Sequence, residues 1–223
     1  MKVAALFSGG KDSVFSVFVA QQYGWDVAYL VTVVPENKES WMYHSLNLSL
    51  VDLQSQAIGI PLIKQETKGE KEEELQELYN VLKKLDIAGV ISGAIASEYQ
   101  RTRIEQVCHQ LNIKSFTPLW HKDPALLLHQ YVSAGFHNMI VGVFAHGFTE
   151  AWLGRPIDEA CIDDLLKLQK KYRINVGGEG GEYETLALDG PLFSKKLVLD
   201  KVEKKWRRDY GTAIVIKSHL EEK

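Results

Sequence analysis

Six residues near the start of the chain have the types and the order needed to hold a phosphate group. The stretch Ser8–Ser13 reads SGGKDS and joins an apolar run at residues 3–7 to a second apolar run at residues 14–20. Its two glycines let the backbone approach a ligand closely, and a helix that begins here points free N–H groups and a positive dipole end at the ligand. Lys11 adds a full positive charge. The stretch therefore predicts a phosphate site at a strand-to-helix turn, although Ser8 would also serve as an ordinary helix cap.

The order of residues separates this turn from two common phosphate loops. A Walker A loop needs GxxxxGK before Ser or Thr, whereas Lys11 directly follows the two glycines and precedes Asp12. The GxGxxG fingerprint of dinucleotide-binding folds is also missing. The pattern S-G-G-x-D-S resembles the pyrophosphate loop of ATP pyrophosphatases of the adenine nucleotide α-hydrolase type. This resemblance implies ATP as the cofactor, bound by Ser8, Gly9, Gly10, Lys11, Asp12 and Ser13.

Composition fits an enzyme better than a dedicated nucleic-acid binder. The chain has 223 residues, of which 45% are hydrophobic and 25% charged, and its formal net charge is −3. Such a chain can bury a substantial core, but it lacks the global positive charge that a phosphate backbone selects. Cys108 and Cys161 form no CxxC pair, so neither a zinc knuckle nor a disulfide scaffold is indicated. We expect a cytoplasmic protein with no signal peptide, no membrane span and no direct nucleic-acid partner; a local basic patch stays open.

Apolar runs typical of strands alternate with helical patterns along the first half of the chain. We expect strands at residues 3–7, 25–34, 61–65 and 88–94, and helices at residues 14–20, 49–58, 71–85 and 97–111. This alternation predicts an α/β fold with a doubly wound parallel sheet. After a boundary near residue 120 we expect a smaller α+β domain with helices at 125–134 and 157–172 and strands at 137–144, 186–189, 197–202 and 212–216. The predicted domains are thus a nucleotide-binding domain at residues 1–120 and a substrate-binding domain at residues 121–223.

A second polar segment follows the fourth expected strand. In doubly wound sheets the ligand lies beyond the carboxyl ends of the strands, where the strand order reverses, so this segment is expected to line the same crevice as SGGKDS. Gly93 and Ala94 are small enough for a nucleotide to lie against the backbone. Arg101 and Arg103 are candidates for bidentate contacts with phosphates.

A structural alternative stays open for this segment. Ser97 is a plausible N-cap for the following helix, and the two arginines have acids at helical spacing, Glu98 and Glu105. In that case the arginines form surface ion pairs and take no part in phosphate binding.

Four glycines and three glutamates crowd residues 177–184. Glycine disfavours a helix and the like charges repel one another, so the segment must be a loop or a turn. One interpretation is a flexible hairpin loop with solvated acids. The other is a tight turn that aims Glu179, Glu182 and Glu184 into the crevice. There the carboxylates would bind Mg²⁺, bind an ammonium or amine, or act as a general base. Composition alone leaves both interpretations open.

Taken together, these segments resemble the diphthine–ammonia ligase family. The motifs that match are SGGKDS, the stretch WMYH at residues 41–44, GAIASEYQRTRIEQVC at residues 93–108, PLW at residues 118–120 and GEGGEYETLALDGPLF at residues 178–193. The resemblance implies ATP-dependent amidation of the diphthine side chain of translation elongation factor 2. Ammonium would be the nitrogen source, an acyl adenylate the intermediate, and AMP and pyrophosphate the products.

The resemblance also implies roles for particular residues. Asp12 is the candidate Mg²⁺ ligand. The candidate catalytic residues are Lys11, Asp12, Glu182 and Glu184. The candidate residues for binding ATP outside the first loop are Gly93, Ala94, Arg101 and Arg103. The candidate residues for binding the substrate are Tyr43, His44, Glu98, Tyr99, Gln100, Glu179, Gly180, Gly181, Glu182, Tyr183, Glu184 and Thr185.

Two other functions remain open at this stage, as does the oligomeric state. A tRNA-modifying ATP pyrophosphatase would call for a basic docking surface or paired cysteines, and neither is evident. A regulatory module that binds ATP without turnover is the second. A homodimer is one hypothesis for the assembly.

Overall fold

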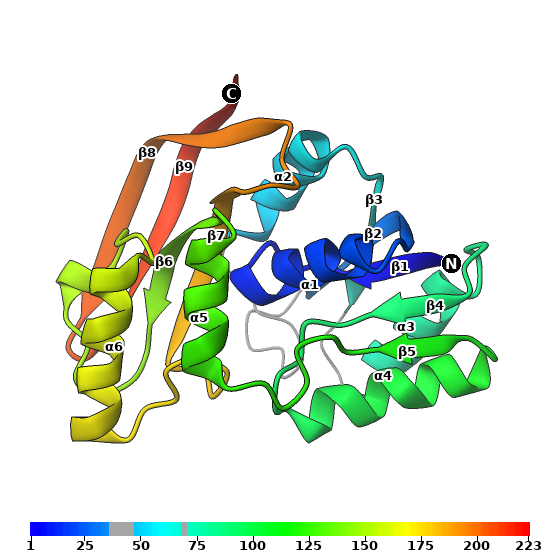
Figure 1. Ribbon diagram of the computed structural model, residues 1–223, viewed down its shortest axis with the longest axis horizontal. Helices are drawn as coiled ribbons and strands as arrows, with labels where there is room; N and C mark the ends of the chain where they lie inside the picture. The colour runs from blue at the N-terminus through cyan, green and yellow to red at the C-terminus, as the bar shows by residue number, and fades with distance from the viewer. Residues whose placement is uncertain (36–46, 68–70) are drawn as a thin grey trace. The chain divides into compact units, whose positions relative to one another are not determined.

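The computed structural model describes residues 1–35, 47–67 and 71–223, which form two compact units (Figure 1). Residues 1–8 and 12–120 make up the first unit, and residues 9–11 and 121–223 make up the second. None of the helices in the described ranges is long and apolar enough to cross a membrane.

The first unit is built on a parallel sheet of five strands in the order β3-β2-β1-β4-β5. Its strands are β1 (Lys2–Leu6), β2 (Asp26–Pro35), β3 (Leu62–Thr67), β4 (Gly89–Ile91) and β5 (Lys114–Phe116). Its helices are α1 (Lys11–Gln22), the short 3₁₀ turn η1 (Leu48–Leu50), α2 (Val51–Ile58), α3 (Lys71–Leu82) and α4 (Glu98–Gln110). The predicted α/β fold class with a parallel sheet is confirmed.

Strand order reverses between β1 and β4, which are hydrogen-bonded neighbours at the middle of the sheet. Residues of α3 and α4 share one hydrophobic core with β1, β2 and β4; its buried members include Ala4, Val31, Leu78, Val90 and Ile104. Right-handed crossovers then place α1 and α2 on the opposite face. The loops that follow β1 and β4 therefore emerge side by side at the carboxyl edge, the position at which such sheets bind ligands.

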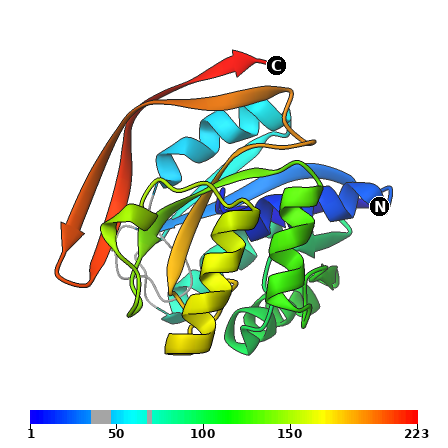
Figure 2. The ribbon, with the colours of Figure 1, turned by 60° about the vertical axis from the view of Figure 1, so that its left-hand side comes forward.

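The second unit contains an antiparallel sheet of four strands in the order β7-β6-β9-β8 (Figure 2). Its strands are β6 (His137–Val143), β7 (Tyr183–Asp189), β8 (Lys195–Arg207) and β9 (Tyr210–Glu222), and its helical segments are α5 (Pro124–Ser133), η2 (Glu150–Trp152) and α6 (Glu159–Tyr172). The side chain of Asp123 caps α5 by accepting a hydrogen bond from Leu126 N–H (2.8 Å), and proline occupies the first turn, as its sequence predicts.

Two features of the fold differ from expectation. Strand β5 was not expected, because three residues are too few to show a period of two. The hairpin strands β8 and β9 each run for 13 residues, roughly twice the expected length, because strand pairing continues through a charged, exposed stretch that has no hydrophobic signal.

Candidate active site

The SGGKDS loop closes on itself through its two serines. Ser8 N–H donates to Ser13 Oγ (3.3 Å), and the two hydroxyl oxygens lie 3.2 Å apart. Gly9 has a φ of +76°, a left-handed conformation that an L side chain adopts only with strain. Helix α1 begins at Lys11, so the first N–H groups of the helix belong to the loop. This is the backbone geometry that suits an anionic ligand.

Gly93 brings the loop after β4 against the same turn. A Cβ atom at Gly93 would lie 2.9 Å from Ser13 N and 3.0 Å from Asp12 C. Both are backbone atoms at the start of α1, so neither can move aside cheaply. The structure thus brings Gly93 together with Asp12 and Ser13, two predicted ATP-binding residues, although they are some 80 positions apart in the sequence.

The middle of the loop is held by strand β7 of the second unit. Lys11 N–H donates to Thr185 Oγ1 (3.1 Å), and Ala187 N–H donates to the carbonyl oxygen of Gly9 (2.9 Å). The loop therefore lies along β7, the strand that begins at the end of the glycine and glutamate segment. The Thr185 hydroxyl accepts this bond from the phosphate loop, and its predicted role in binding the substrate stays a prediction.

The Lys11 side chain reaches into the glycine and glutamate segment itself. Its Nζ donates to the carbonyl oxygen of Gly177 (2.6 Å) and lies 5.4 Å from the centroid of the Tyr183 ring. The Tyr183 hydroxyl in turn donates to the carbonyl oxygen of Val176 (2.7 Å). Because Lys11 is only 5% exposed, its charge sits in a site with little water, where an anion would interact with it strongly.

Residues 175–182 form an ordered turn, which favours the second of the two interpretations of this segment. Gly178 and Gly181 have φ values of +76° and +84°. Asn175 Oδ1 accepts from Gly177 N–H (2.9 Å), and Gly181 N–H donates to the carbonyl oxygen of Gly178 (3.1 Å). Asn175 was not among the predicted site residues, but an Asn two residues before a Gly is a recognisable signal for such a turn.

Glu182 serves this turn with one of its two carboxylate oxygens. Oε1 accepts from Asn175 N–H (2.8 Å), and the carboxylate lies so close to Gly180 that a Cβ there would be 2.8 Å from Oε1. Oε2 is buried and has no hydrogen-bond partner among the described residues. Glu182 therefore has a structural role and a second oxygen available for chemistry. Glu179 and Glu184 flank it, Glu184 within β7, and their predicted roles stay predictions.

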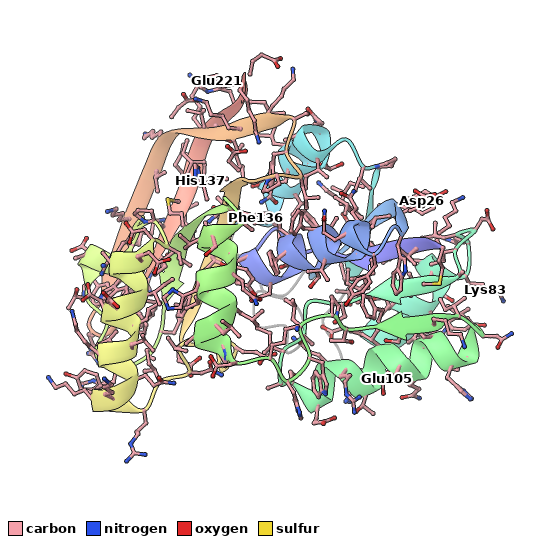
Figure 3. All side chains as sticks on the ribbon, viewed as in Figure 1. Asp26, Lys83, Glu105, Phe136, His137 and Glu221 are labelled. Carbon is pink, nitrogen blue, oxygen red and sulfur yellow. The ribbon has the colours of Figure 1, made fainter. Side chains whose placement is uncertain are left out.

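The arginines of α4 show the partners expected under the structural alternative. Ser97 caps the helix, accepting from Gln100 N–H at 3.4 Å, and Arg101 pairs with Glu98 (3.3 Å) and with Glu105 (3.1 Å), which Figure 3 labels on α4. The Arg103 guanidinium lies 3.7 Å from the centroid of the Tyr99 ring. In both arginines Nε is buried and lacks an acceptor among the described residues. Phosphate binding by these arginines stays a prediction.

Tyr43 and His44 lie outside the described residues. Within the described ranges no cluster of three or more His, Cys, Asp or Glu side chains has the geometry of a metal site, and Mg²⁺ binding by Asp12 stays a prediction. Burial raises the pKa of both cysteine thiols, Cys108 and Cys161, to about 11, so neither is a ready nucleophile.

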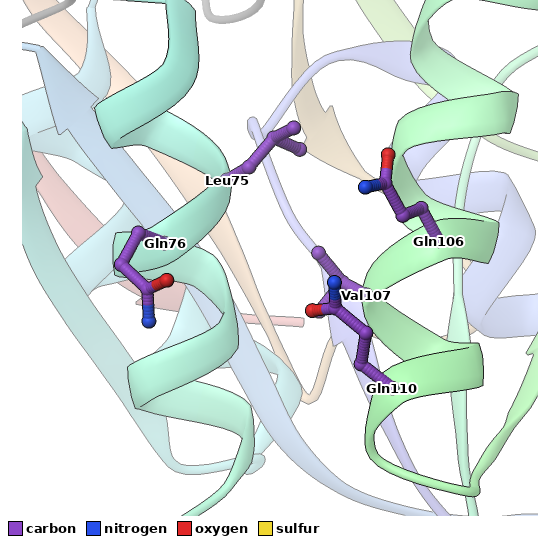
Figure 4. Close-up of a pocket in the computed structure, with 5 residues that line it drawn as sticks. All are labelled: Leu75, Gln76, Gln106, Val107 and Gln110. Carbon is purple, nitrogen blue, oxygen red and sulfur yellow. The ribbon is translucent and has the colours of Figure 1, made fainter.

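A hollow between α3 and α4 offers no competing nucleotide site. Its volume is about 150 Å³, and its lining carries no charge: Leu75, Gln76, Gln106, Val107 and Gln110 (Figure 4). A triphosphate carries several negative charges, and this lining supplies no positive charge to neutralise them.

Gly93→Ala is expected to weaken ATP binding because the new methyl group displaces backbone at the start of α1. Overpacking of this kind typically costs about 1–3 kcal/mol. Gly24→Ala is the matched control: it is strained by a φ of +73° but meets no atom within 4 Å. Calorimetric titration with ATP should show a clear loss of affinity for Gly93→Ala alone, at similar melting temperatures. Equal affinities in the two variants would remove Gly93 from the site.

Thr185→Val is expected to raise the KM for ATP, because a methyl group replaces the oxygen that accepts from Lys11 N–H. Loss of such a partner costs about 1–3 kcal/mol, which corresponds to roughly tenfold or more in KM. Thr185→Ser keeps the hydroxyl and should stay near the parent value. If Val and Ser variants have the same KM for ATP, the hydroxyl does not position the loop.

Comparison with known proteins adds the family. The N-terminal domain model of diphthamide synthase matches residues 1–115, and the C-terminal domain model matches residues 123–220. Three relatives named diphthine–ammonia ligase are also similar. The protein from Bos taurus is 36% identical over 91% of this chain and 84% of its own length, and that from Danio rerio is 35% identical over 100% and 98%. The protein from Schizosaccharomyces pombe is 38% identical over 91% of this chain, which spans only 37% of that longer relative. The chain therefore belongs to the diphthamide synthase family.

Proposed function

We propose that the protein is an ATP-dependent diphthine–ammonia ligase. It joins ammonia to the carboxylate of diphthine on translation elongation factor 2 and releases AMP and pyrophosphate. One observation carries this proposal: the SGGKDS loop is hydrogen-bonded to the segment that contains GEGGEYET, through Lys11 with Thr185 and Lys11 with Gly177. SGGKDS, the motif expected to bind ATP, and GEGGEYET, the motif more specific to this family, thus form one structural element.

The chemistry divides into two steps. A diphthine carboxylate oxygen attacks the α-phosphorus of ATP, the bond to the β-phosphate bridge breaks, and pyrophosphate leaves. Ammonia then attacks the carbonyl carbon of the acyl adenylate, a C–N bond forms, and AMP departs with the C–O electron pair. Ammonium must lose a proton before it attacks, so a base is needed at the acceptor.

Residues of the SGGKDS loop act in the first step, the formation of the acyl adenylate. The loop binds the pyrophosphate through backbone N–H groups, hydroxyls and the Lys11 charge, with contacts from Ser8, Gly9, Gly10, Lys11 and Ser13. Asp12 would hold Mg²⁺, an ion that supplies charge neutralisation between the phosphates. Gly93 and Ala94 would leave room for the nucleotide, while Arg101 and Arg103 would stabilise the α-phosphate.

Residues of the glycine and glutamate turn act in the second step, the attack of ammonia on the acyl adenylate. Glu182 presents the buried Oε2, which suits it to bind ammonium and accept its proton, and Glu179 and Glu184 add negative charge that favours the cation. Tyr183, together with Gly180 and Gly181, would contact the diphthine side chain beside Glu182. We place the enzyme in the cytoplasm, where reducing conditions suit its two unpaired cysteines. We retain a homodimer as a hypothesis that sedimentation equilibrium tests.

The proposed reaction is tested by product formation. We expect AMP and pyrophosphate to appear in equal amounts only when ATP, ammonium and diphthine-bearing elongation factor 2 are all present, with a mass change on the factor that matches amidation. Turnover that required tRNA would assign the chain to a tRNA-modifying pyrophosphatase instead. Tight ATP binding without turnover in any mixture would assign a regulatory module.

The charge of Glu182 is tested separately from its role in the turn. Glu182→Gln keeps an oxygen that can accept from Asn175 N–H but removes the negative charge. We expect its kcat to fall by about 10²-fold or more, at an unchanged melting temperature and KM for ATP. Asp12→Asn should lower kcat similarly. Near-normal turnover of Glu182→Gln, together with an unfolded Glu182→Ala, would show that this residue only shapes the turn.

A further inference from the structure

The turn that joins β8 to β9 is unusually basic for this chain. Residues 204–210 read KKWRRDY, with four cations and one carboxylate, in a protein whose formal net charge is −3. We call Lys204, Lys205, Arg207 and Arg208 the basic tip. All four side chains are exposed.

The cations of the basic tip lack the partners that neutralise other lysines of the hairpin. Lys195 pairs with Glu222 and Lys196 pairs with Glu221, each at 2.6 Å; Figure 3 labels Glu221 on β9. Across the described residues, no carboxylate lies within ion-pair distance of any member of the basic tip. Their charge is therefore available to a partner.

Two exposed aromatic rings adjoin the basic tip. Phe144 and Tyr210 stack with ring centroids 6.5 Å apart and an interplanar angle of 25°, and they remain 41% and 40% exposed. Tyr210 lies opposite Arg207 in the hairpin, and Lys205 lies two residues before Arg207, so these three side chains share one face. Stacked, half-exposed rings next to arginine are typical of the centre of a protein interface.

The basic tip and its two aromatic rings are held in place by packing and strand pairing. A Cβ atom at Gly211 would lie 2.6 Å from the Trp206 ring and 2.9 Å from Leu153, so the indole covers the glycine and Leu153, from outside the hairpin, packs at the same position. Strand β9 also pairs with β6 at this level, through Val143 and Gly211. A partner that docks here meets a surface that is already in place, which lowers the entropy cost of binding.

The same surface lies beside the glycine and glutamate turn. Val143 of β6 is paired with Tyr183 on one side and with Gly211 on the other, so two strand spacings, about 10 Å, separate the turn from the hairpin. Phe144 connects them directly, because its N–H donates to the carbonyl oxygen of Glu182 (2.8 Å) while its ring stacks on Tyr210.

Protection of a sheet edge explains only part of this arrangement. Strand β8 is an edge strand, and lysines on such a strand prevent it from pairing with other chains. That function accounts for Lys204 and Lys205. It does not account for Arg208 in the turn, or for exposed aromatic rings on β9 and at the end of β6.

We propose that the basic tip, with Phe144 and Tyr210, docks an acidic segment of the protein substrate and so delivers its diphthine side chain to the turn around Glu182. The inference rests on the proposed function. The positive charge of the basic tip attracts an acidic partner, so it also orients the encounter.

The test compares two double variants with equal changes of charge on the same hairpin. Lys205→Glu/Arg207→Glu reverses the tip, whereas Lys201→Glu/Lys217→Glu changes exposed lysines farther along the strands. For the tip variant, we expect the KM for diphthine-bearing elongation factor 2 to rise about tenfold or more, with kcat and the KM for ATP unchanged. The control should stay within about twofold of the parent enzyme, and added salt should raise the parent KM but hardly that of the tip variant.

Each remaining outcome overturns the assignment. An unchanged KM for the protein substrate, in an active parent enzyme, contradicts docking at the tip. A fall in kcat alone would indicate a structural effect. If a labelled oligouridylate binds the parent chain and not the tip variant while the KM for the protein substrate is equal, the tip contacts nucleic acid instead. Affinity for the elongation factor, measured without ATP, tests docking even if turnover is absent, and an equal dissociation constant for the two double variants refutes it.

Discussion

The structure of the site depends on the hydrogen bonds that fasten the phosphate loop to β7. Lys11 N–H donates to the hydroxyl oxygen of Thr185, and Ala187 N–H, two residues farther along the strand, donates to the carbonyl oxygen of Gly9. The loop that would hold the phosphates is therefore hydrogen-bonded to the strand that begins in the glutamate-rich turn.

Lys11 shows how this arrangement suits ATP. Its ammonium group is nearly buried and is met by a carbonyl dipole at Gly177 and by the face of the Tyr183 ring. A phosphate would bring a full opposite charge to this nearly buried ammonium group. Glu182 shows the reverse case, a carboxylate with one oxygen committed to Asn175 and the other buried. The ammonium group of Lys11 and the carboxylate of Glu182 thus both bind backbone groups of the same turn.

Much of this could be predicted from sequence, for physical reasons. Periodicity predicts most of the strands and helices, and a rule of sheet topology predicts that the loops after β1 and β4 meet, which the contact of Gly93 with Ser13 confirms. The roles of individual residues in the glycine and glutamate segment could not be predicted. Composition does not distinguish a flexible loop from a tight turn, and it cannot show that Glu182 accepts from Asn175 or that Thr185 holds Lys11, because these contacts depend on side-chain directions. The length of the β8 and β9 hairpin was missed because its exposed, charged residues carry no apolar period.

We propose that SGGKDS and the glycine and glutamate segment bind ATP together, and hydrogen exchange tests this. With saturating ATP and Mg²⁺, we expect slower exchange of backbone N–H groups in residues 8–13 and, in the same titration, in residues 176–187, with equal apparent dissociation constants for the two segments. Protection confined to residues 8–13, with exchange in residues 176–187 unchanged, would contradict it.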